Sequence, residues 1–382
     1  MVDRSNLDKR TLTAQAMGTI DEATGAIVPP VHVSTTYLRD ADNSYGKGLV
    51  YARADNPTHT HAESLLAALE EGEAACLFAS GMAAATAVFQ TLRPGDHVLA
   101  PRIMYWSLRD WLLNAAQAWG LLVDLVDMSD TGAVEAALRP GVTRLVWLET
   151  PANPLWTLSD IAAIAAAAHA VGARVAVDST VATPVLSRPL ALGADLVMHS
   201  ATKYLNGHSD VIAGALVTAA RDEAWQRIVK HRAQGGAVLG PQDAALLLRG
   251  MRTLHLRVEA ASASALSLAH ALERHPGLAE VLYPGLPDHP QHALARGQMP
   301  GGFGGMLSIR VKGGAAAAIA TAAKVGLWKR ATSLGGVESL IEHRASIEGP
   351  GTPVPDDLLR LSVGIEAWSD LLADLEAALP SG

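Results

Sequence analysis

The feature that most constrains the fold of this 382-residue chain is an alternation of short apolar runs with alanine-rich helical stretches, from Glu73 to about Thr218. Most of the apolar runs are continuous rather than alternating, as expected for strands that helices cover on both faces. A repeated order of strand, helix and strand predicts an α/β fold with a mostly parallel seven-stranded sheet. The predicted strands are Ala75–Phe78, His97–Ala100, Leu122–Val126, Arg144–Leu148, Arg174–Val177, Leu196–Met198 and Ala213–Val217.

The helix expected after Glu149 has clear end signals. Ser159 is a predicted N-cap, Asp160 suits the positive end of the helix dipole, and Gly172 suits the left-handed position after the last turn. These signals predict a crossover helix between two parallel strands.

A long helical stretch from Pro241 through about Arg274 separates this region from shorter elements that follow. We predict a smaller C-terminal α+β domain there, reached through a long linking helix. Its expected strands and helices are Ala279–Tyr283, Gly305–Val311, Leu358–Val363, Ala315–Lys324 and Asp370–Ala378. The predicted division is residues 1–60 for an N-terminal arm, residues 61–250 for the α/β domain and residues 251–382 for the C-terminal domain.

The segment from Pro29 to Pro57 is rich in Pro, Asp, Asn, Gly and Tyr and has no helical period. A long irregular segment in a compact protein is seldom without a role. It is either a flexible tail or an arm that packs on another subunit. Its tyrosines and arginines favour the arm, because disordered tails are poor in aromatic residues.

Composition excludes several classes of protein. The chain has 30 Lys and Arg against 38 Asp and Glu, and nothing in this balance suggests the basic face expected of a nucleic-acid binder. No run of about 18 uncharged apolar residues predicts a membrane span, and the polar N-terminus has no signal core, so we expect a cytoplasmic enzyme. The single cysteine, Cys76, excludes an intrachain disulfide and a cysteine-cluster metal site, and we expect it to be an inert core residue.

Two predicted strands end in residues that can carry chemistry. One ends in Asp178, and the next ends in a segment that leads to Lys203. Open α/β sheets bind ligands at the carboxyl ends of their strands, and a desolvated lysine can form a Schiff base there. A lysine Schiff base with an aspartate on a pyridinium nitrogen is what a protein contributes to a pyridoxal phosphate site. For an isolated Asp and Lys, the alternative is an ordinary ion pair.

Neighbouring segments favour the cofactor site. The turn at Ser80-Gly81 lets backbone N–H groups approach an anion at a helix start, and Ser200 and Thr202 offer hydroxyls for a phosphate. Tyr105 follows a strand and could stack on a heteroaromatic ring, although strand-end tyrosines often serve packing alone. A turn after Glu149 presents Asn153, for which the alternative is a turn-capping amide.

Together these segments resemble the trans-sulfuration enzymes, the pyridoxal-phosphate-dependent family that includes cystathionine γ-synthase, γ-lyase and β-lyase. The resemblance runs from about Thr11 to Leu379, and it implies a fold-type I transferase-like architecture. The segments that carry it are YARADNPT (51–58), FASGMAA (78–84), ETPANP (149–154), DSTVATPVLSRPLALGADLVMHSATKYLNGHSDVIAG (178–214), SLGGVESL (333–340) and LLRLSVGIE (358–366).

The resemblance implies a role for individual residues. Lys203 would hold the cofactor and move protons, Asp178 would keep the pyridine nitrogen protonated, and Tyr105 would stack on the ring and assist proton transfer. The implied cofactor-binding set is Gly81, Met82, Tyr105, Asn153, Asp178, Ser200, Thr202 and Lys203, together with Tyr51 and Arg53 from a neighbouring subunit.

The implied substrate site centres on Arg360, which would bind the substrate carboxylate bidentately, with Asn153 and Ser333 assisting. The contribution of Tyr51 and Arg53 to a neighbour's site implies a homodimer with shared active sites, and the family suggests a homotetramer. No metal site, nucleic-acid partner or membrane partner is expected.

The choice of reaction depends on departures from the family pattern. Members with γ-chemistry usually have glutamate before the Ser-Leu-Gly-Gly motif and a β-lyase type has tyrosine, whereas this chain has Thr332. An arginine four residues after Tyr105, here Arg109, resembles the pattern of bacterial β-lyases. Val181 stands where the family often has an aromatic residue, three positions after Asp178. His343 and Arg344 predict an entrance to the active site with a different shape.

Because the segment SLGGVESL resembles that of family members with γ-chemistry, we expect a γ-lyase or γ-synthase that acts on cystathionine or another homoserine-derived amino acid. Canavanine-like substrates, with oxygen on Cγ, remain open. The alternatives are a cystathionine β-lyase and a non-catalytic pyridoxal-phosphate-binding protein.

Three other signals are interpreted structurally. Gly301–Gly305 precedes a predicted strand, so we expect a packing turn rather than a dinucleotide loop. His59 with His61, and Glu342 with His343, are expected to be exposed pairs rather than metal ligands.

Overall fold

The computed structural model describes residues 7–349 and 351–380, and its larger sheet has seven strands in the order β1-β7-β6-β5-β4-β2-β3. Strands β2 to β6 are parallel to one another, whereas β7 is antiparallel to both β6 and β1. The predicted mostly parallel sheet is therefore confirmed. Its strands are β1 (Ala74–Phe78), β2 (His97–Pro101), β3 (Leu122–Val126), β4 (Thr143–Glu149), β5 (Arg174–Asp178), β6 (Leu196–His199) and β7 (Gly214–Thr218).

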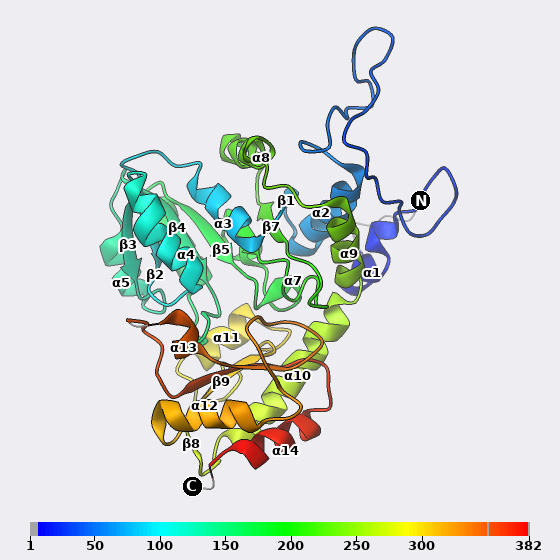
Figure 1. The fold of residues 1–382 in the computed structure, drawn as a ribbon. Helices are drawn as coiled ribbons and strands as arrows, with labels where there is room; N and C mark the ends of the chain where they lie inside the picture. Colours follow the sequence, from blue (N-terminus) through cyan, green and yellow to red (C-terminus); the bar gives the residue numbers. More distant parts are fainter. Residues whose placement is uncertain (1–6, 350, 381–382) are drawn as a thin grey trace.

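Helices cover both faces of this sheet (Figure 1). Successive residues of β2 belong to different cores: Val98 packs with helices α3, α4 and α8, and Leu99 packs with α5 and α6. Two-sided burial explains why the strands are continuous apolar runs. The helices around the sheet are α2 (Pro57–Glu70), α3 (Gly81–Phe89), α4 (Trp106–Trp111), α5 (Thr131–Ala137), α6 (Ile161–Ala170), α7 (Thr183–Leu186) and α8 (Glu223–Gly235).

The N-cap of helix α6 is Asp160, one residue later than the predicted N-cap, Ser159. The Asp160 carboxylate, not Ser159, accepts the N–H of Ala163 at 3.0 Å. Ser159 is buried, and its own N–H donates to Thr150 Oγ1, which holds it in the preceding turn. Gly172 has φ +79° directly after the C-cap, as predicted.

The C-terminal region forms a second sheet of five strands, in the order β10-β11-β12-β9-β8. The expected long helix is broken near Arg252 into α9 and α10, and α10 runs from the end of α9 along the C-terminal region towards α14 (Figure 1). Two strands were not predicted, β10 and β11, because each is only two to four residues long. The elements are α9 (Pro241–Met251), α10 (Leu254–Leu272), β8 (Leu278–Leu282), α11 (His292–Gln298), β9 (Met306–Val311), α12 (Gly314–Lys324), β10 (Lys329–Arg330), β11 (Leu340–His343), α13 (Arg344–Glu348), β12 (Leu358–Ser362) and α14 (Trp368–Ala378).

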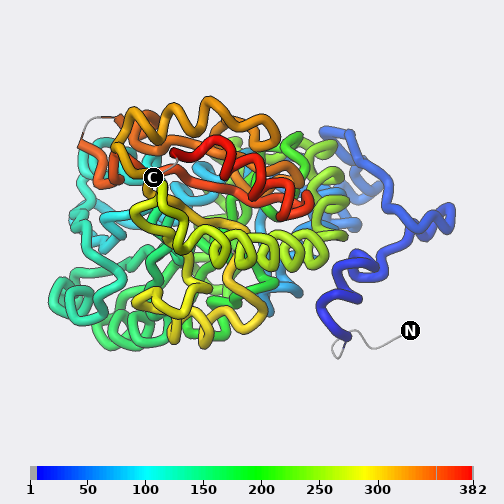
Figure 2. Tube along the Cα trace, turned by 90° about the horizontal axis from the view of Figure 1, so that it is seen from below, coloured from blue at the N-terminus to red at the C-terminus, as the bar shows by residue number. Residues whose placement is uncertain are grey.

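The N-terminal segment is a projecting loop. After α1 (Lys9–Ala14) and a short 3-10 turn, residues 19–56 contain only an isolated bridge between Thr36 and Tyr51. Both views show this loop extending away from the body (Figures 1 and 2). It exposes apolar side chains, with Leu38 97% and Val33 67% accessible. Such exposure is costly for a chain on its own and favours contact with another molecule.

Within residues 7–349 and 351–380, no helix is long and apolar enough to cross a membrane.

Candidate active site

Lys203 lies in the loop after β6, at the carboxyl edge of the larger sheet. Its Nζ donates a hydrogen bond to Ser333 Oγ at 2.8 Å. Burial, followed by the nearby positive charge of Arg360, lowers the pKa of Lys203 to about 8. At pH 7 roughly a tenth of the molecules therefore carry Lys203 as a neutral amine, the form that attacks a carbonyl.

Asp178 ends β5 directly beside Glu149, which ends β4 in the same register. Burial raises the pKa of Asp178, and burial together with the charge of Asp178 raises the pKa of Glu149. Among the described residues no lysine, arginine or histidine forms an ion pair with either carboxylate. Asp178 Oδ1 accepts from the N–H and hydroxyl of Thr180, and its Oδ2 has no partner in the described part of the chain. This edge can therefore accept a cationic group such as a pyridinium N–H.

Glu149 is a site residue to which the sequence analysis gave no role. One of its carboxylate oxygens accepts the N–H of Tyr105 at 2.7 Å, and the other accepts the N–H of Asn153 at 3.1 Å. The carboxylate thus fixes the backbone of two predicted cofactor residues. The signal that could have found it was present, since Glu149 ends a buried strand as Asp178 does.

The turn before α3 has the shape of an anion cradle. A Cβ atom on Gly81 would lie 2.9 Å from both Cβ and Oγ of Ser200, so only glycine fits there. Ser80 Oγ caps the helix by accepting the N–H of Ala83, which leaves the first N–H groups, at Gly81 and Met82, pointing out of the helix end. Ser200 Oγ has no hydrogen-bond partner among the described residues.

The lysine loop is tied to this cradle and to the strand edge. Thr180 Oγ1 accepts the N–H of Ser200 at 2.8 Å while donating to Asp178. Thr202 Oγ1 donates to the carbonyl of Ala213 and accepts its N–H, so this hydroxyl is already used in closing the loop. The loop geometry brings Ser200, Lys203 and Asp178 to one edge, as predicted; the role of Thr202 in binding phosphate stays a prediction.

Arg360, on β12, faces the same region from the C-terminal sheet. It is buried, with Nη1 donating to Asn153 Oδ1 at 3.2 Å and Nη2 donating to the carbonyl of Ser333 at 2.8 Å. Burial lowers the pKa of Arg360 to about 10, and the charge of Glu342 opposes that shift. The guanidinium stays cationic at neutral pH and can bind a carboxylate.

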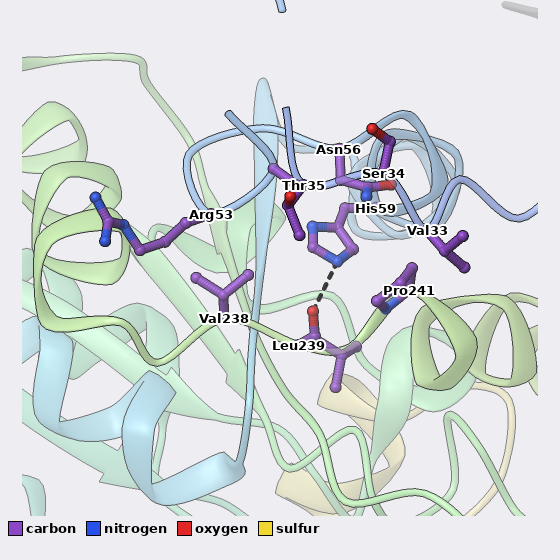
Figure 3. Close-up of a pocket in the computed structure, with 10 residues that line it drawn as sticks. Val33, Ser34, Thr35, Arg53, Asn56, His59, Val238, Leu239 and Pro241 are labelled. Atoms are coloured by element: carbon purple, nitrogen blue, oxygen red, sulfur yellow. Dashed lines mark hydrogen bonds between the residues drawn. The ribbon is translucent and has the colours of Figure 1, made fainter. Parts of the chain in front are cut away.

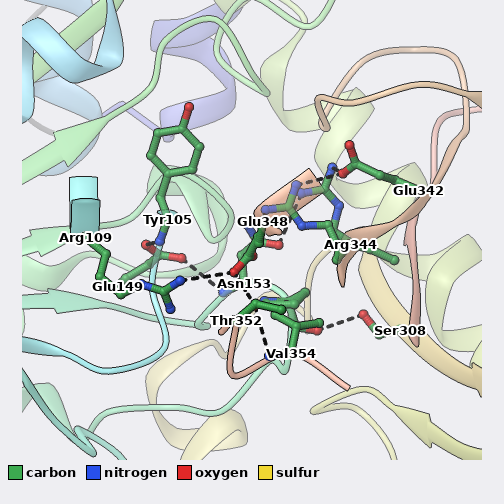
Figure 4. A network of polar contacts seen from close by, with 12 residues as sticks. Tyr105, Arg109, Glu149, Asn153, Ser308, Glu342, Arg344, Glu348, Thr352 and Val354 are labelled. Atoms are coloured by element: carbon green, nitrogen blue, oxygen red, sulfur yellow. Dashed lines mark hydrogen bonds and ion pairs between the residues drawn. The ribbon is translucent and has the colours of Figure 1, made fainter. Parts of the chain in front are cut away.

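The expectation that Glu342 is exposed is wrong. It is 5% accessible, because β11 pairs it directly with Arg360 on β12, and its Oε2 lies 2.6 Å from Arg360 Nη2. His343 is only partly accessible and contacts Ser346 Oγ and the carbonyl of Asp356. Arg344, predicted at the entrance, is 2% accessible and lies within the ion network of Figure 4.

The expectation that His59 is exposed is also wrong. It is 3% accessible, and its Nε2 lies 2.9 Å from the carbonyl of Leu239, because α2 packs on the start of α9 (Figure 3). Arg53 lines the pocket at this junction. The Arg53 guanidinium lies 5.5 Å from the ring centre of Tyr51. Within the described single chain, neither Tyr51 nor Arg53 hydrogen-bonds to Gly81, Ser200 or Lys203.

Two structural interpretations are confirmed. Cys76 is buried, and burial raises the pKa of its thiol to about 12, so it is unreactive. The segment Gly301–Gly305 is a packing turn before β9, in which Ser262 Oγ accepts the N–H groups of Phe303 and Gly304.

These residues fit pyridoxal phosphate. The site offers a partly neutral amine at Lys203, a half-buried carboxylate without a cation at Asp178, and a glycine cradle with an unused hydroxyl at Ser200. They match the aldehyde, the pyridine nitrogen and the phosphate of that cofactor.

The sequence matches the family described as Cys/Met metabolism PLP-dependent enzyme over residues 10–380. It is 48% identical to a cystathionine gamma-synthase of Mycobacterium tuberculosis, with 94% of this chain and 93% of the relative covered. It is 45% identical to an L-methionine gamma-lyase of Pseudomonas deceptionensis, with 94% of each covered. It is 39% identical to a cystathionine beta-lyase of Coxiella burnetii, with 98% of each covered.

Solved structures of related enzymes have closely similar folds. The crystal structure of metB from Corynebacterium glutamicum superimposes with a TM-score of 0.95 at 39% identity, and 99% of each chain is covered. A cystathionine gamma synthase from Xanthomonas oryzae pv. oryzae in complex with cystathionine gives 0.93 at 38% identity, with 97% of each covered.

Proposed function

Because the chain belongs to the pyridoxal-phosphate-dependent enzymes of cysteine and methionine metabolism, we propose that it eliminates or replaces a substituent at Cγ of an amino acid. The substrate is cystathionine or another homoserine-derived amino acid. The gamma-synthase and gamma-lyase names of its relatives support this chemistry.

Lys203, Asp178 and the Gly81 turn hold the cofactor, with Met82, Ser200 and Thr202 around its phosphate and Tyr105 and Asn153 beside its ring. Bound pyridoxal phosphate supplies an electron sink for negative charge at the substrate Cα. The carboxylate of Asp178 maintains that sink by keeping the pyridine nitrogen protonated. Its burial strengthens this electrostatic interaction.

Lys203 moves the protons. Its Nζ removes the proton from Cα, and a further proton shift from Cβ allows the substituent on Cγ to leave. A pKa near 8 places this amine close to the working pH of a general base. Elimination followed by hydrolysis yields a 2-oxo acid and ammonia, whereas attack by a thiol at Cγ yields the replacement product.

The observation that carries the proposal is the position of Ser333 between Lys203 and Arg360. Its hydroxyl accepts from Lys203 Nζ, and its carbonyl accepts from Arg360 Nη2, each at 2.8 Å. With the substrate carboxylate on Arg360 and Asn153, one residue thus connects the substrate anchor to the proton-transferring amine. Fixed orientation of this kind lowers the barrier to proton transfer.

The second candidate is β-cleavage of cystathionine. Two observations favour it: the 39% identity to a cystathionine beta-lyase, and the resemblance of Arg109 to the arginine of bacterial β-lyases. Thr332 departs from both the glutamate of the γ-group and the tyrosine of the β-lyase type. The same departure keeps canavanine-like substrates, with oxygen on Cγ, within the substrate range.

The enzyme forms homodimers with shared active sites, and these dimers assemble into a homotetramer. It works in the cytoplasm. Residues 1–60 form the arm that brings Tyr51 and Arg53 to the neighbouring site, residues 61–250 form the cofactor domain, and residues 251–382 form the C-terminal domain. Exposed apolar side chains of the arm, such as Leu38, support this assignment.

An activated homoserine ester tests the function directly. The holoenzyme should release 2-oxobutyrate from the ester alone and form cystathionine when cysteine is added. The Lys203→Ala variant should do neither and should lack the visible absorption band of the lysine-bound cofactor. A wild-type protein that remains colourless with added pyridoxal phosphate would overturn the proposal, whereas one that takes up the cofactor but forms neither product would support the non-catalytic alternative.

A further inference from the structure

The arginine assigned to the substrate carboxylate already has a carboxylate beside it. Glu342 Oε2 lies 2.6 Å from Arg360 Nη2, and both side chains are about 95% buried. A buried pair of this kind would be close to neutral by itself. A substrate carboxylate would then meet the negative charge of Glu342 in a region of low dielectric constant, where repulsion is strong.

Arg344 changes this balance. Its Nη1 donates to the same Glu342 oxygen at 2.9 Å, and its Nη2 donates to Glu348 Oε1 at 3.0 Å. Glu348 Oε2 in turn accepts from Thr352 Oγ1 at 2.7 Å and lies 3.4 Å from Arg109 Nη2 on α4. Figure 4 shows these side chains in one continuous row.

The row has three guanidinium groups and two carboxylates. Arg109, Arg344 and Arg360 face Glu342 and Glu348 in alternating order, so one positive charge is left without a partner. Arg109 is held at one end of the row, by Glu348. The excess positive charge is therefore available at the other end of the row, where Arg360 can bind an anionic ligand.

We propose that Arg344 is a positioning residue that draws the charge of Glu342 away from Arg360 and so leaves Arg360 able to bind the substrate α-carboxylate. The proposal rests on the proposed function, in which Arg360 binds that carboxylate. Glu348 supports Arg344 from the other side and links α13 to α4. Arg344 need not touch the substrate for this effect.

Charge removal distinguishes this role from simple packing. In Arg344→Met, Glu342 and Arg360 form a closed neutral pair, so carboxylate binding should weaken. In the double variant Arg344→Met/Glu342→Gln, the opposing carboxylate is gone and Arg360 regains its free charge. If Arg344 served packing alone, the second change would add damage rather than remove it.

The test compares two ligands of the holoenzyme, L-2-aminobutyrate and propylamine, which differ by the α-carboxylate and carry no leaving group. Binding is measured by calorimetry and by the change in the cofactor absorption band. We expect Arg344→Met to bind aminobutyrate about tenfold more weakly. Propylamine binding should be unchanged, and the double variant should return aminobutyrate to within about threefold of wild type.

Matched variants control for folding. Arg310→Met breaks an ion pair with Asp357 in the same C-terminal sheet, away from this row, and should leave both ligands unaffected. If Arg344→Met does not fold, Arg344→Lys keeps the charge but cannot bridge Glu342 and Glu348 as a planar fork does, and an intermediate loss is expected.

Three results would overturn the inference. Unchanged aminobutyrate binding in Arg344→Met, or in Arg344→Lys if the first variant is unfolded, contradicts it while leaving the proposed function intact. So does a double variant that binds aminobutyrate no better than Arg344→Met. A wild-type enzyme that does not prefer aminobutyrate to propylamine removes the assigned role of Arg360 and the inference with it.

Discussion

Lys203 Nζ lies 2.8 Å from Ser333 Oγ and donates a hydrogen bond to it. The backbone of Ser333 has φ +96°, a region that side-chain-bearing residues seldom adopt, and its carbonyl accepts from Arg360. A strained backbone at a residue that bridges two functional groups indicates that the surrounding contacts enforce its position. Ser333 therefore joins the amine of the larger domain to the carboxylate-binding arginine of the C-terminal sheet.

We predict that Ser333→Ala lowers kcat about tenfold, because Lys203 loses the hydrogen bond that orients its amine. The cofactor should remain bound, since Ser333 lies outside the Gly81 cradle. Steady-state rates and the visible absorption band measure the two effects. Ser267→Ala removes a partly exposed serine hydroxyl on α10 and is the control. An unchanged kcat in Ser333→Ala would contradict the orienting role.

The pKa of Lys203 predicts how cofactor capture depends on pH. The neutral amine attacks the aldehyde, so the rate at which apoprotein takes up pyridoxal phosphate should rise with pH and level off above about 8. Arg360→Met removes a positive charge that lowers this pKa, so the midpoint should move upward. Stopped-flow absorbance measures both profiles. A wild-type midpoint near 10.5, the ordinary value for lysine, would show that burial does not lower the pKa.

Asp178→Asn should have opposite effects on the apoprotein and the holoenzyme. Burial raises the pKa of Asp178, so its charge destabilises the folded apoprotein above the ordinary pKa of 3.8, and the penalty disappears as pH falls below that value. At pH 7 the neutral amide should raise the apoprotein Tm by about 2–4 °C.

The same substitution removes the anion that faces the pyridinium, so cofactor affinity should fall by about a hundredfold or more. Calorimetric unfolding with and without pyridoxal phosphate measures both effects in one preparation. An apoprotein that loses stability, or a cofactor affinity that does not change, would contradict the assignment. Thr180→Val, which removes the hydroxyl that donates to Asp178 and accepts the N–H of Ser200 but keeps the Asp178 charge, should give a smaller loss of affinity.

Shared sites predict complementation between inactive variants. Arg53→Met lacks the arm contribution, and Lys203→Ala lacks the amine. In randomly mixed dimers, half of the molecules contain both variants and one of their two sites has both functional groups. Refolding equal amounts together should therefore restore about one quarter of wild-type activity. No recovery after subunit exchange, verified by mass labels, would place Tyr51 and Arg53 outside the neighbouring site.

The residues predicted from the sequence are mainly those whose role depends on local order. Apolar runs and small residues nearby in the chain define the strand end at Asp178, the loop that carries Lys203 and the Ser80-Gly81 turn. The buried network was not predictable in this way. Glu342 contacts Arg360 because β11 pairs with β12, and Glu348 contacts Arg109 across more than 200 positions of sequence.

Local signals also failed where tertiary packing overrides them. His59 looks like an exposed polar residue in sequence, but the contact between α2 and the start of α9 buries it against the Leu239 carbonyl. Ser159 is a good cap by composition, yet its hydrogen bond to Thr150 delays the start of α6 to Asp160.

The most direct test of the proposed chemistry is the identity of the 2-oxo acid that the purified holoenzyme forms from L-cystathionine. Cleavage at Cγ releases 2-oxobutyrate, cysteine and ammonia, whereas cleavage at Cβ releases pyruvate, homocysteine and ammonia. Our account predicts 2-oxobutyrate, absent in Lys203→Ala. Pyruvate as the principal product would contradict it and establish β-cleavage.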